Sequence, residues 1–283
     1  MLSILIPTHD YTCYQLVADL HQQAQALGIS FEIIVAEDGS RSQVDIIANH
    51  KITELPCCRH IIQQKNKGRA AIRNQLMNEA KGTLILFIDA DGRVVRENFL
   101  KQYVAAGQTH DVVCGGVKTL NECHDPSRTL RWKYERAYEQ QHGYISEQFR
   151  SFCFMISRRV AQRVRFDERY TGYGFEDVQF GKDLQTAGFQ VYAIDNPLEN
   201  ADIETNKDFL KKTEEALRTA FQFHHEIGDH ITLVRTYERY KTWKWILLLA
   251  YRIFGPTMRC NLLSGHPSLS IFSFYKLCYY ASL

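Results

Sequence analysis

Two carboxylates that stand two residues apart, Asp89 and Asp91, are the side chains of this sequence best suited to bind a hard cation. They follow the apolar run Leu84–Ile88, which is typical of a strand buried on both faces. Residues i and i+2 of an extended segment project to the same side, so both carboxylates can face one ligand. Mg²⁺ and Mn²⁺ prefer oxygen ligands and often share them with phosphates. An Asp-x-Asp pair taken alone, however, is more often a solvated turn after a strand.

Two further carboxylates, Glu37 and Asp38, follow a second apolar run, Phe31–Ala36. A carboxylate in this place can accept a hydrogen bond from a base N–H or from a ribose hydroxyl. An ordinary turn before a helix explains the pair equally well, because Asp-Gly-Ser is common in turns. The sequence is therefore equally compatible with a ligand-binding role and a structural role for this pair.

Arg69 and Arg73 share one face of a helix predicted over Gly68–Ala80, because they are four residues apart. That face can meet an anionic ligand or form an ion pair with one of the carboxylates above. For an isolated arginine pair, a solvated helix face is the simpler interpretation.

Glu176 and Asp177 follow the glycine-rich segment Thr171–Phe175 and open a helix predicted to end near Ala187. The positive end of the helix dipole keeps a carboxylate ionised there. An ionised carboxylate that faces a cleft can act as a general base. An N-cap, or ordinary charge in the first helical turn, is the alternative.

Apolar runs and helical patterns alternate in the first half of the chain, which is typical of a parallel, doubly wound sheet with helices on its faces. The predicted strands are Leu2–Ile6, Phe31–Ala36, Arg59–Ile62 and Leu84–Ile88, and the predicted helices are Tyr14–Leu27 and Gly68–Ala80. In such a sheet the ligand lies beyond the carboxyl ends of the strands. Four loops are therefore expected to meet at that edge: Pro7–Asp10, Glu37–Ser40, Asn66–Arg69 and Asp89–Gly92.

The second half is predicted to add three strands, at Asp111–Lys118, Phe152–Ile156 and Phe189–Ile194. Helices are predicted over Asp125–Gln141 and Glu176–Ala187. From Asn206 onward the pattern indicates helices only.

Composition excludes several classes of protein. The 283 residues carry a formal net charge of only +2, which argues against a generic nucleic-acid binder. No Gly-x-Gly-x-x-Gly follows a strand and no Walker-type loop occurs, so a dinucleotide-dependent oxidoreductase and a P-loop ATPase are disfavoured. The eight cysteines show no paired framework, and we expect reduced thiols in a cytosolic protein. We expect no secretion signal, because the N-terminus lacks a basic region followed by an apolar core.

The segment from Ile231 to the end combines aromatic and basic side chains. It holds seven basic residues and one acidic residue, Glu238, whereas the rest of the chain has a net negative charge. Its most apolar stretch, Trp243–Phe254, is shorter than the roughly 20 residues of a spanning helix. Two interpretations are equally good: an interfacial segment on an anionic leaflet, or a surface that packs on the catalytic domain or in a homodimer.

Five motifs occur in a definite order: strand-Pro-Thr, strand-Glu-Asp-Gly-Ser, Asn-x-Gly-Arg-Ala-Ala-x-Arg-Asn, strand-Asp-Ala-Asp and Gly-x-Gly-x-Glu-Asp. They lie in SILIPTHDY, FEIIVAEDGS, NKGRAAIRNQLMNEAKGTLILFIDAD and GYGFEDVQFGKDLQTAGF. In this order and spacing the chain resembles the family 2 glycosyltransferases of GT-A fold over residues 1–200. The resemblance implies a Rossmann-like, mostly parallel α/β sheet flanked by helices, followed by a helical C-terminal extension.

The resemblance also implies transfer of a sugar from a nucleotide-sugar, usually UDP-linked, with inversion at the anomeric carbon. It implies that Asp177 is the base, that Glu176 holds acceptor or sugar, and that Asp91 with Asp89 binds the diphosphate and Mn²⁺ or Mg²⁺. The residues implied to bind the donor are Pro7, Thr8, Glu37 or Asp38, Gly68, Arg69, Arg73, Asp89 and Ala90.

On this resemblance we expect a glycosyltransferase domain over residues 1–205, with a nucleotide-binding half, 1–118, and an acceptor and catalytic half, 119–205. Residues 206–283 form the extension. We expect a glycan or lipid-linked acceptor, a part in bacterial surface polysaccharide synthesis, and a cytoplasmic protein that is peripheral to the inner face of the membrane if its tail is interfacial.

The sequence departs from the family pattern at two places. The family more often has Asp-Asp where this chain has Glu37-Asp38, and many members place a histidine, often a metal ligand, where this chain has Asn200. Asp202, Glu199 or water are the candidates to replace that histidine. Its absence favours one rival, a non-catalytic scaffold or partner subunit. The other rival, a sugar-phosphate nucleotidyltransferase, normally carries a glycine- and basic-rich phosphate loop, which the first loop of this chain is not.

Overall fold

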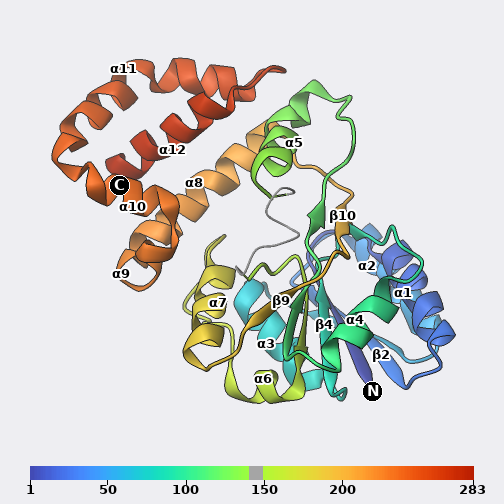
Figure 1. The fold of residues 1–283 in the computed structure, drawn as a ribbon. Coiled ribbons are helices and arrows are strands. Elements are labelled where there is room, and N and C mark those ends of the chain that lie inside the picture. The colour runs from blue at the N-terminus through green and yellow to red at the C-terminus, as the bar shows by residue number, and fades with distance from the viewer. Residues whose placement is uncertain (140–148) are drawn as a thin grey trace. The chain divides into compact units, whose positions relative to one another are not determined.

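The computed structural model describes residues 1–139 and 149–283, and the chain forms two compact units. Unit 1 comprises Met1–Thr119, Gln140–Thr171 and Phe180–Asp202. Unit 2 comprises Leu120–Glu139, Gly172–Gln179 and Ile203–Leu283 (Figure 1). The domain limits expected from the sequence stay a prediction.

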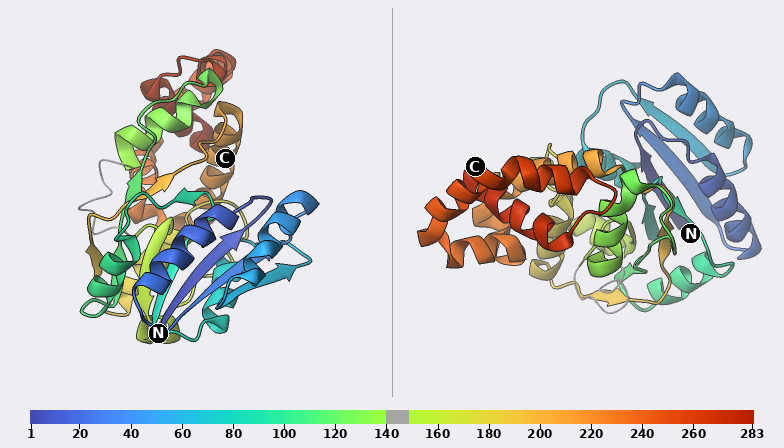
Figure 2. Two further views of the ribbon diagram at one scale, coloured as in Figure 1. Left: turned by 90° about the vertical axis from the view of Figure 1, so that its right-hand side faces the viewer. Right: turned by 90° about the horizontal axis from the view of Figure 1, so that it is seen from above.

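Unit 1 is built on a mostly parallel sheet of seven strands, as predicted (Figures 1 and 2). Its order is β3-β2-β1-β4-β8-β6-β9. Among the described strands of this seven-stranded sheet, only β8 runs antiparallel to its neighbours, β4 and β6. The strands are β1 Leu2–Thr8, β2 Phe31–Asp38, β3 Cys58–Gln63, β4 Leu84–Ile88, β6 Val112–Cys114, β8 Cys153–Ser157 and β9 Val191–Ala193.

The inner strands of this sheet, and not the edge strands β3 and β9, are buried on both faces, because their successive side chains alternate between two apolar layers. In β1, Ile4 and Ile6 join one layer and Leu5 joins the other. Helices α1 (Tyr14–Ala26) and α4 (Phe99–Gly107) contribute to the layer of Ile4 and Ile6. The layer of Leu5 contains side chains of α3 (Arg69–Glu79), α6 (Arg158–Arg163) and α7 (Glu176–Thr186). This is the doubly wound arrangement that the alternating pattern indicated.

The strand predicted over Asp111–Lys118 is instead divided between two sheets. Gly116 has a φ of +84°, a conformation open to glycine, and the chain changes direction between β6 and β7 (Val117–Lys118). β7 belongs to a small sheet with order β5-β10-β7, in which β5 is Gly92–Arg93 and β10 is Leu198–Asn200. Sequence patterns missed β5 and β10 because strands of two or three residues carry no periodicity.

One predicted helix needs correction, and two helices were missed. The helix predicted over Asp125–Gln141 is a 3₁₀ turn η2 (Pro126–Arg128), the helix α5 (Thr129–Tyr134) and a π-helical turn η3 (Glu135–Glu139), and Gln141 lies outside the described residues. Helices α2 (Gln43–His50) and α4 were not predicted. In α2 the apolar residues Val44 and Ile47 are exposed, so the helix has no buried stripe to reveal it.

Unit 2 is helical after residue 206, as predicted. Its helices there are α8 (Asn206–Gln222), α9 (His224–Ile227), α10 (Thr232–Arg239), α11 (Lys244–Leu263) and α12 (Leu269–Ser282). Short 3₁₀ turns are η1 (Lys51–Glu54) in unit 1, and η4 (Gly228–His230) and η5 (Lys241–Trp243) in unit 2. Among the helices that the structure describes, none combines the length and apolar character needed to cross a membrane.

The turn after β2 generates a stability prediction. Gly39 has a φ of +67°, and a Cβ placed on it would lie 2.2 Å from the backbone nitrogen of Asn66. Gly28 has a similar φ of +62° but nothing within 4 Å of its Cβ position. We expect Gly28→Ala to cost about 1 kcal/mol of unfolding free energy, from backbone strain alone. Gly39→Ala should cost about 1–3 kcal/mol more, because the Asn66 backbone must move. Urea titration followed by circular dichroism measures both, and equal losses would contradict the close approach.

Candidate active site

Asp89 stands at the carboxyl end of β4, where a buried arginine fixes its carboxylate. The Arg73 guanidinium donates from Nη2 to Asp89 Oδ1 at 2.9 Å, and Arg73 is only 1% exposed. The same guanidinium lies 5.4 Å from the ring centre of Phe166. The sequence offered several carboxylates as ion-pair partners for Arg73, and the structure shows this ion pair with Asp89.

Arg69 lies on the same helix but is exposed, so the two arginines do not share one environment. The helix is further held by Asn74, whose side-chain amide donates to the carbonyl of Phe166 at 2.8 Å and accepts from its N–H at 3.0 Å. The buried arginine is thus supported by a fixed neighbouring chain segment.

The small sheet holds the backbone of Asp91 against the chain segment that follows β10. In the pairing of β5 with β10, Asn200 stands opposite Gly92. The N–H of Ala201 donates to the carbonyl of Asp91 at 3.1 Å. Burial raises the pKa of Tyr11 to about 12, and the negative charges of Asp202 and then Asp91 add to the shift. Asp91 and Asp202 therefore both lie within electrostatic reach of the Tyr11 hydroxyl.

Glu199, another candidate to replace the expected histidine, instead pairs with two basic side chains. It is buried and forms ion pairs with Arg93 and, at 3.1 Å, with Lys118. Burial by itself would raise the pKa of the Glu199 carboxyl, but hydrogen bonds from these two cations hold it below its ordinary value. Asp202, by contrast, directly follows Ala201, whose N–H donates to the Asp91 carbonyl.

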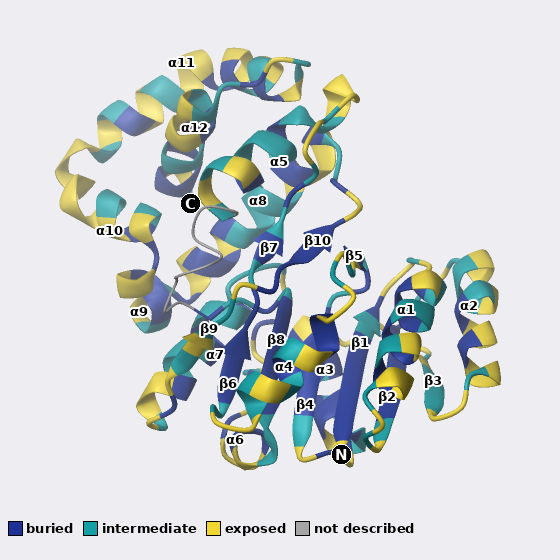
Figure 3. Cartoon of the chain, turned by 45° about the vertical axis from the view of Figure 1, so that its right-hand side comes forward, coloured by how far each residue is buried: buried dark blue, intermediate teal, exposed yellow. Residues whose placement is uncertain are grey.

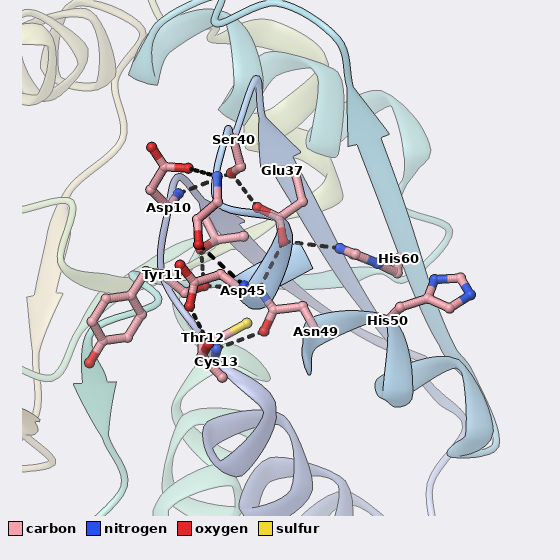
Figure 4. Close-up of polar contacts among 12 residues, drawn as sticks. Asp10, Tyr11, Thr12, Cys13, Glu37, Ser40, Asp45, Asn49, His50 and His60 are labelled. Atoms are coloured by element: carbon pink, nitrogen blue, oxygen red, sulfur yellow. Dashed lines mark hydrogen bonds and ion pairs between the residues drawn. The ribbon is translucent and has the colours of Figure 1, made fainter. Parts of the chain in front are cut away.

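Glu37 is fully buried at the end of β2 and accepts hydrogen bonds from three side chains (Figure 4). Asn49 Nδ2 donates at 2.8 Å, the Nε2 of His60 lies at 3.1 Å, and the Ser40 hydroxyl donates to the other oxygen. Burial opposes ionisation, but the hydrogen bonds from His60, Ser40 and Asn49 hold the pKa of Glu37 below its ordinary value. The carboxylate thereby links β2, α2 and β3.

Asp38 is also buried, and both of its oxygens hold the loop before α3. Oδ1 accepts from the N–H of Lys67 at 2.7 Å and Oδ2 accepts from that of Gly68 at 3.0 Å. The backbone carbonyl of Asp38 lies 2.8 Å from Nδ1 of His9. Asp38 thus ties together the loops after β1 and before α3, which the sequence predicted to meet.

The remaining residues predicted to bind the donor lie on the same strand ends. The Thr8 hydroxyl is buried and donates to the carbonyl of Tyr11 at 3.0 Å, and Pro7 beside it is half-buried. Ala90 is buried between the two aspartates. Tyr11 itself was missed, although its place three residues after Thr8, in a loop at the ligand edge, was the available signal. Contact of these residues with a donor stays a prediction.

Glu176 and Asp177 begin α7, in the part of the chain assigned to unit 2. Glu176 is buried, and the Val178 N–H donates to Asp177 Oδ1 at 2.9 Å. The backbone before them is unusual, because both Gly174 and Phe175 have positive φ, at +93° and +68°. For phenylalanine this conformation is strained, so contacts around the loop must hold it.

Helix α8 supplies those contacts. The N–H of Tyr173 donates to Glu215 Oε1 at 3.0 Å, and the Thr219 hydroxyl donates to the carbonyl of Tyr173 at 3.1 Å. Gly174 packs so closely on Ala216 that a Cβ there would lie 2.8 Å from the alanine methyl. The sequence assigned α8 to an extension and did not indicate that it positions the Glu176-Asp177 motif.

Within the described ranges 1–139 and 149–283, no group of three or more His, Cys, Asp and Glu side chains is arranged to hold a metal ion. Mg²⁺, however, is commonly held by one or two protein carboxylates together with substrate phosphates. The oxygen donors of Asp91 and Asp202 fit that requirement in number and in chemistry.

Comparison with solved structures defines the class of the fold. The chain is similar to the crystal structure of S. aureus TarS 1-349, with a TM-score of 0.50 and 17% identity over 75% of this chain and 63% of that one. It is equally similar to crystal structures of TarS 1-349 in complex with UDP-GlcNAc, at 16% identity, and with UDP, at 17%. At such identities the likeness shows the fold, which is a GT-A-like mixed α/β fold. The chain spans less than two thirds of these TarS chains.

Sequence comparison gives the family. An uncharacterized glycosyltransferase of Haemophilus influenzae is 29% identical over 119 residues, which are 41% of this chain and 46% of the relative. Residues 3–165, more than half of the chain, match the family model described as glycosyl transferase family 2. The chain belongs to glycosyl transferase family 2, as the motifs predicted.

The buried Glu37 generates a prediction for pH dependence. Its pKa is lowered in the folded state, so ionised Glu37 stabilises the fold above its unfolded pKa, and this contribution is lost as pH falls through the folded pKa. We expect Glu37→Gln to reduce the free energy of unfolding by about 1–3 kcal/mol at neutral pH. The difference from wild type should shrink as the pH is lowered below the ordinary pKa of glutamate, 4.5.

Urea unfolding across pH measures this effect. The exposed Glu54→Gln variant is the control and should match wild type at every pH. A difference between Glu37→Gln and wild type that stays constant with pH would show that the charge of Glu37 contributes nothing.

Proposed function

We propose that the protein transfers a sugar from a UDP-sugar to a hydroxyl of a glycan or glycolipid acceptor, with inversion of the anomeric carbon. The observation that carries the proposal is the hydrogen bond from the Ala201 N–H to the Asp91 carbonyl, which brings the segment of Asp202 to the sheet edge where Arg73 holds Asp89 in place. This is where a doubly wound sheet binds its ligand. The TarS complexes with UDP and UDP-GlcNAc support a uridine nucleotide as the donor.

The site is suited to the parts of such a donor. The Tyr11 ring offers an aromatic face, and Asp89 offers a carboxylate oxygen to ribose hydroxyls. Asp91 and Asp202 would hold Mn²⁺ or Mg²⁺, with the diphosphate oxygens completing its coordination. Such an ion supplies Lewis-acid stabilisation of the leaving nucleotide diphosphate. We assign to Asp202 the place of the missing histidine, whose absence was the argument for a non-catalytic scaffold.

The reaction that these residues support is a single displacement. The Asp177 carboxylate removes the proton from the acceptor hydroxyl as its oxygen attacks the anomeric carbon. The bond from that carbon to the diphosphate breaks, and the nucleotide leaves with the electron pair. The position of Asp177 in the first turn of α7 favours the ionised form that a base needs. We assign Glu176 to holding acceptor or sugar, and no covalent enzyme intermediate is required.

We assign the reaction to the cytoplasm and to bacterial surface polysaccharide synthesis, with a lipid-linked glycan as one class of acceptor. All eight cysteines are unbridged, which supports a reducing compartment. Family membership favours glycosyl transfer over the nucleotidyl transfer considered from the sequence.

Two substitutions separate donor binding from transfer. The protein is incubated with Mn²⁺ and a panel of UDP-, GDP- and dTDP-sugars, and nucleotide release is measured with and without extract acceptors. Asp91→Asn should lose metal-dependent donor binding, because an amide binds a hard cation more weakly than a carboxylate. Asp177→Asn should keep donor binding and lose about 10²–10⁴-fold in turnover. Equal turnover by wild type and Asp177→Asn would refute the assigned base.

The hydrogen bonds between α8 and the backbone of Tyr173 are tested in the same assay. Glu215→Ala removes the acceptor of the Tyr173 N–H, so the strained loop before Glu176 loses one of its contacts. We expect kcat to fall about tenfold or more while KM for the donor is unchanged. Glu215→Gln retains a carbonyl oxygen and should recover most of kcat. A rise in donor KM with unchanged kcat would place Glu215 on the donor side instead.

A further inference from the structure

The outer face of helix α11 is an apolar surface open to solvent. Six apolar or weakly polar side chains repeat there every three or four residues, and all six are exposed: Trp245, Leu249, Ile253, Pro256, Cys260 and Leu263. The exposed fractions of Trp245, Leu249 and Ile253 are 64%, 50% and 56%. A helix normally turns such a stripe towards the protein core. In Figure 3 the exposed colour runs along α10 and α11.

The inner face of α11 already has its partners. Leu247, Met258 and Leu262 are buried, and Leu247 packs in a cluster with Cys278 and Ala281 of α12. Arg259 also turns inward, where it donates to the Tyr275 hydroxyl at 3.1 Å. The helix therefore has two apolar faces, of which unit 2 uses one.

Positive charge surrounds the first half of this stripe. The exposed cations Arg239, Lys241 and Arg252 lie on α10, η5 and α11, with half-buried Lys244 between them. Glu238 is the only acidic residue from 231 to 283, and it is paired with Lys241 at 3.2 Å. Two exposed tryptophans, Trp243 and Trp245, lie among these cations. Tryptophan is enriched where an apolar region meets water at a membrane surface.

We propose that the outer face of α11 binds the surface of an anionic membrane, with the helix lying in the plane of the interface. At 20 residues α11 is about 30 Å long, and its first three exposed apolar residues, Trp245, Leu249 and Ile253, precede the proline inside the helix, Pro256. An interfacial helix buries its apolar face at the boundary of headgroups and acyl chains, and flanking cations attract acidic lipids. Charge favours a membrane over a second copy of this chain, because a symmetric contact would bring two basic surfaces together.

The test uses the whole 283-residue chain without donor, so its outcome is independent of the proposed transfer reaction. Binding to phosphatidylcholine vesicles is compared with binding to vesicles that also contain phosphatidylglycerol, by co-sedimentation and tryptophan fluorescence. Wild type should bind the anionic vesicles about tenfold or more tightly, with a blue shift of its emission. Leu249→Ser/Ile253→Ser should lower that binding about tenfold or more, because apolar burial anchors the helix.

Two control variants sharpen the comparison. Val44→Ser/Ile47→Ser removes two apolar residues of α2 that are 78% and 64% exposed, and it should bind like wild type. Lys241→Glu/Arg252→Glu should remove the preference for anionic vesicles. Thermal unfolding confirms that each variant is folded, and light scattering reports oligomeric state. Absence of vesicle binding by wild type, equal binding by the α11 and α2 variants, or a dimer lost only in the α11 variant would overturn the proposal.

Discussion

The ion pair between Arg73 and Asp89 is the interaction on which the edge of the sheet depends. A guanidinium that is almost fully buried loses its hydration, and the Asp89 carboxylate returns much of that free energy. Removing one partner of a buried ion pair typically costs about 3–5 kcal/mol. Because Arg73 belongs to α3 and Asp89 ends β4, the pair fixes helix and strand together at the place where the ligand is expected.

The carboxylates at this edge divide into two groups by what they do in the fold. Glu37 and Asp38 are buried and accept hydrogen bonds that join neighbouring strands, helices and loops. Asp91 is half-buried and Asp202 is exposed, and the negative charge of each helps to raise the pKa of Tyr11. The first group makes the edge rigid, and the second concentrates negative charge there. A divalent cation with a diphosphate is the ligand that such a charge pair most directly suits.

The helical C-terminal region has a further role inside unit 2. Glu215 and Thr219 of α8 hold both backbone groups of Tyr173, which keeps two successive residues at positive φ just before the Glu176-Asp177 motif. Strain of this kind persists only where surrounding contacts enforce it. Helix α8 is thus tied to the loop that begins α7, while α11 has an outer face with no use in the packing of unit 2.

The sequence by itself determined the alternating strands and helices, their doubly wound arrangement and the four loops at one edge, because apolar periodicity and turn residues are local signals. The order of motifs also determined the family. Only the tertiary structure decided that Arg73 is buried against Asp89, that Glu199 pairs with Arg93 and Lys118, and that the N–H of Ala201, next to Asp202, donates to the Asp91 carbonyl. Those outcomes depend on strand pairs such as β5 with β10, whose partners are far apart in the chain and too short to show a pattern. The same holds for Glu215 and Tyr173, since one hydrogen bond across a packed helix leaves no trace in local spacing.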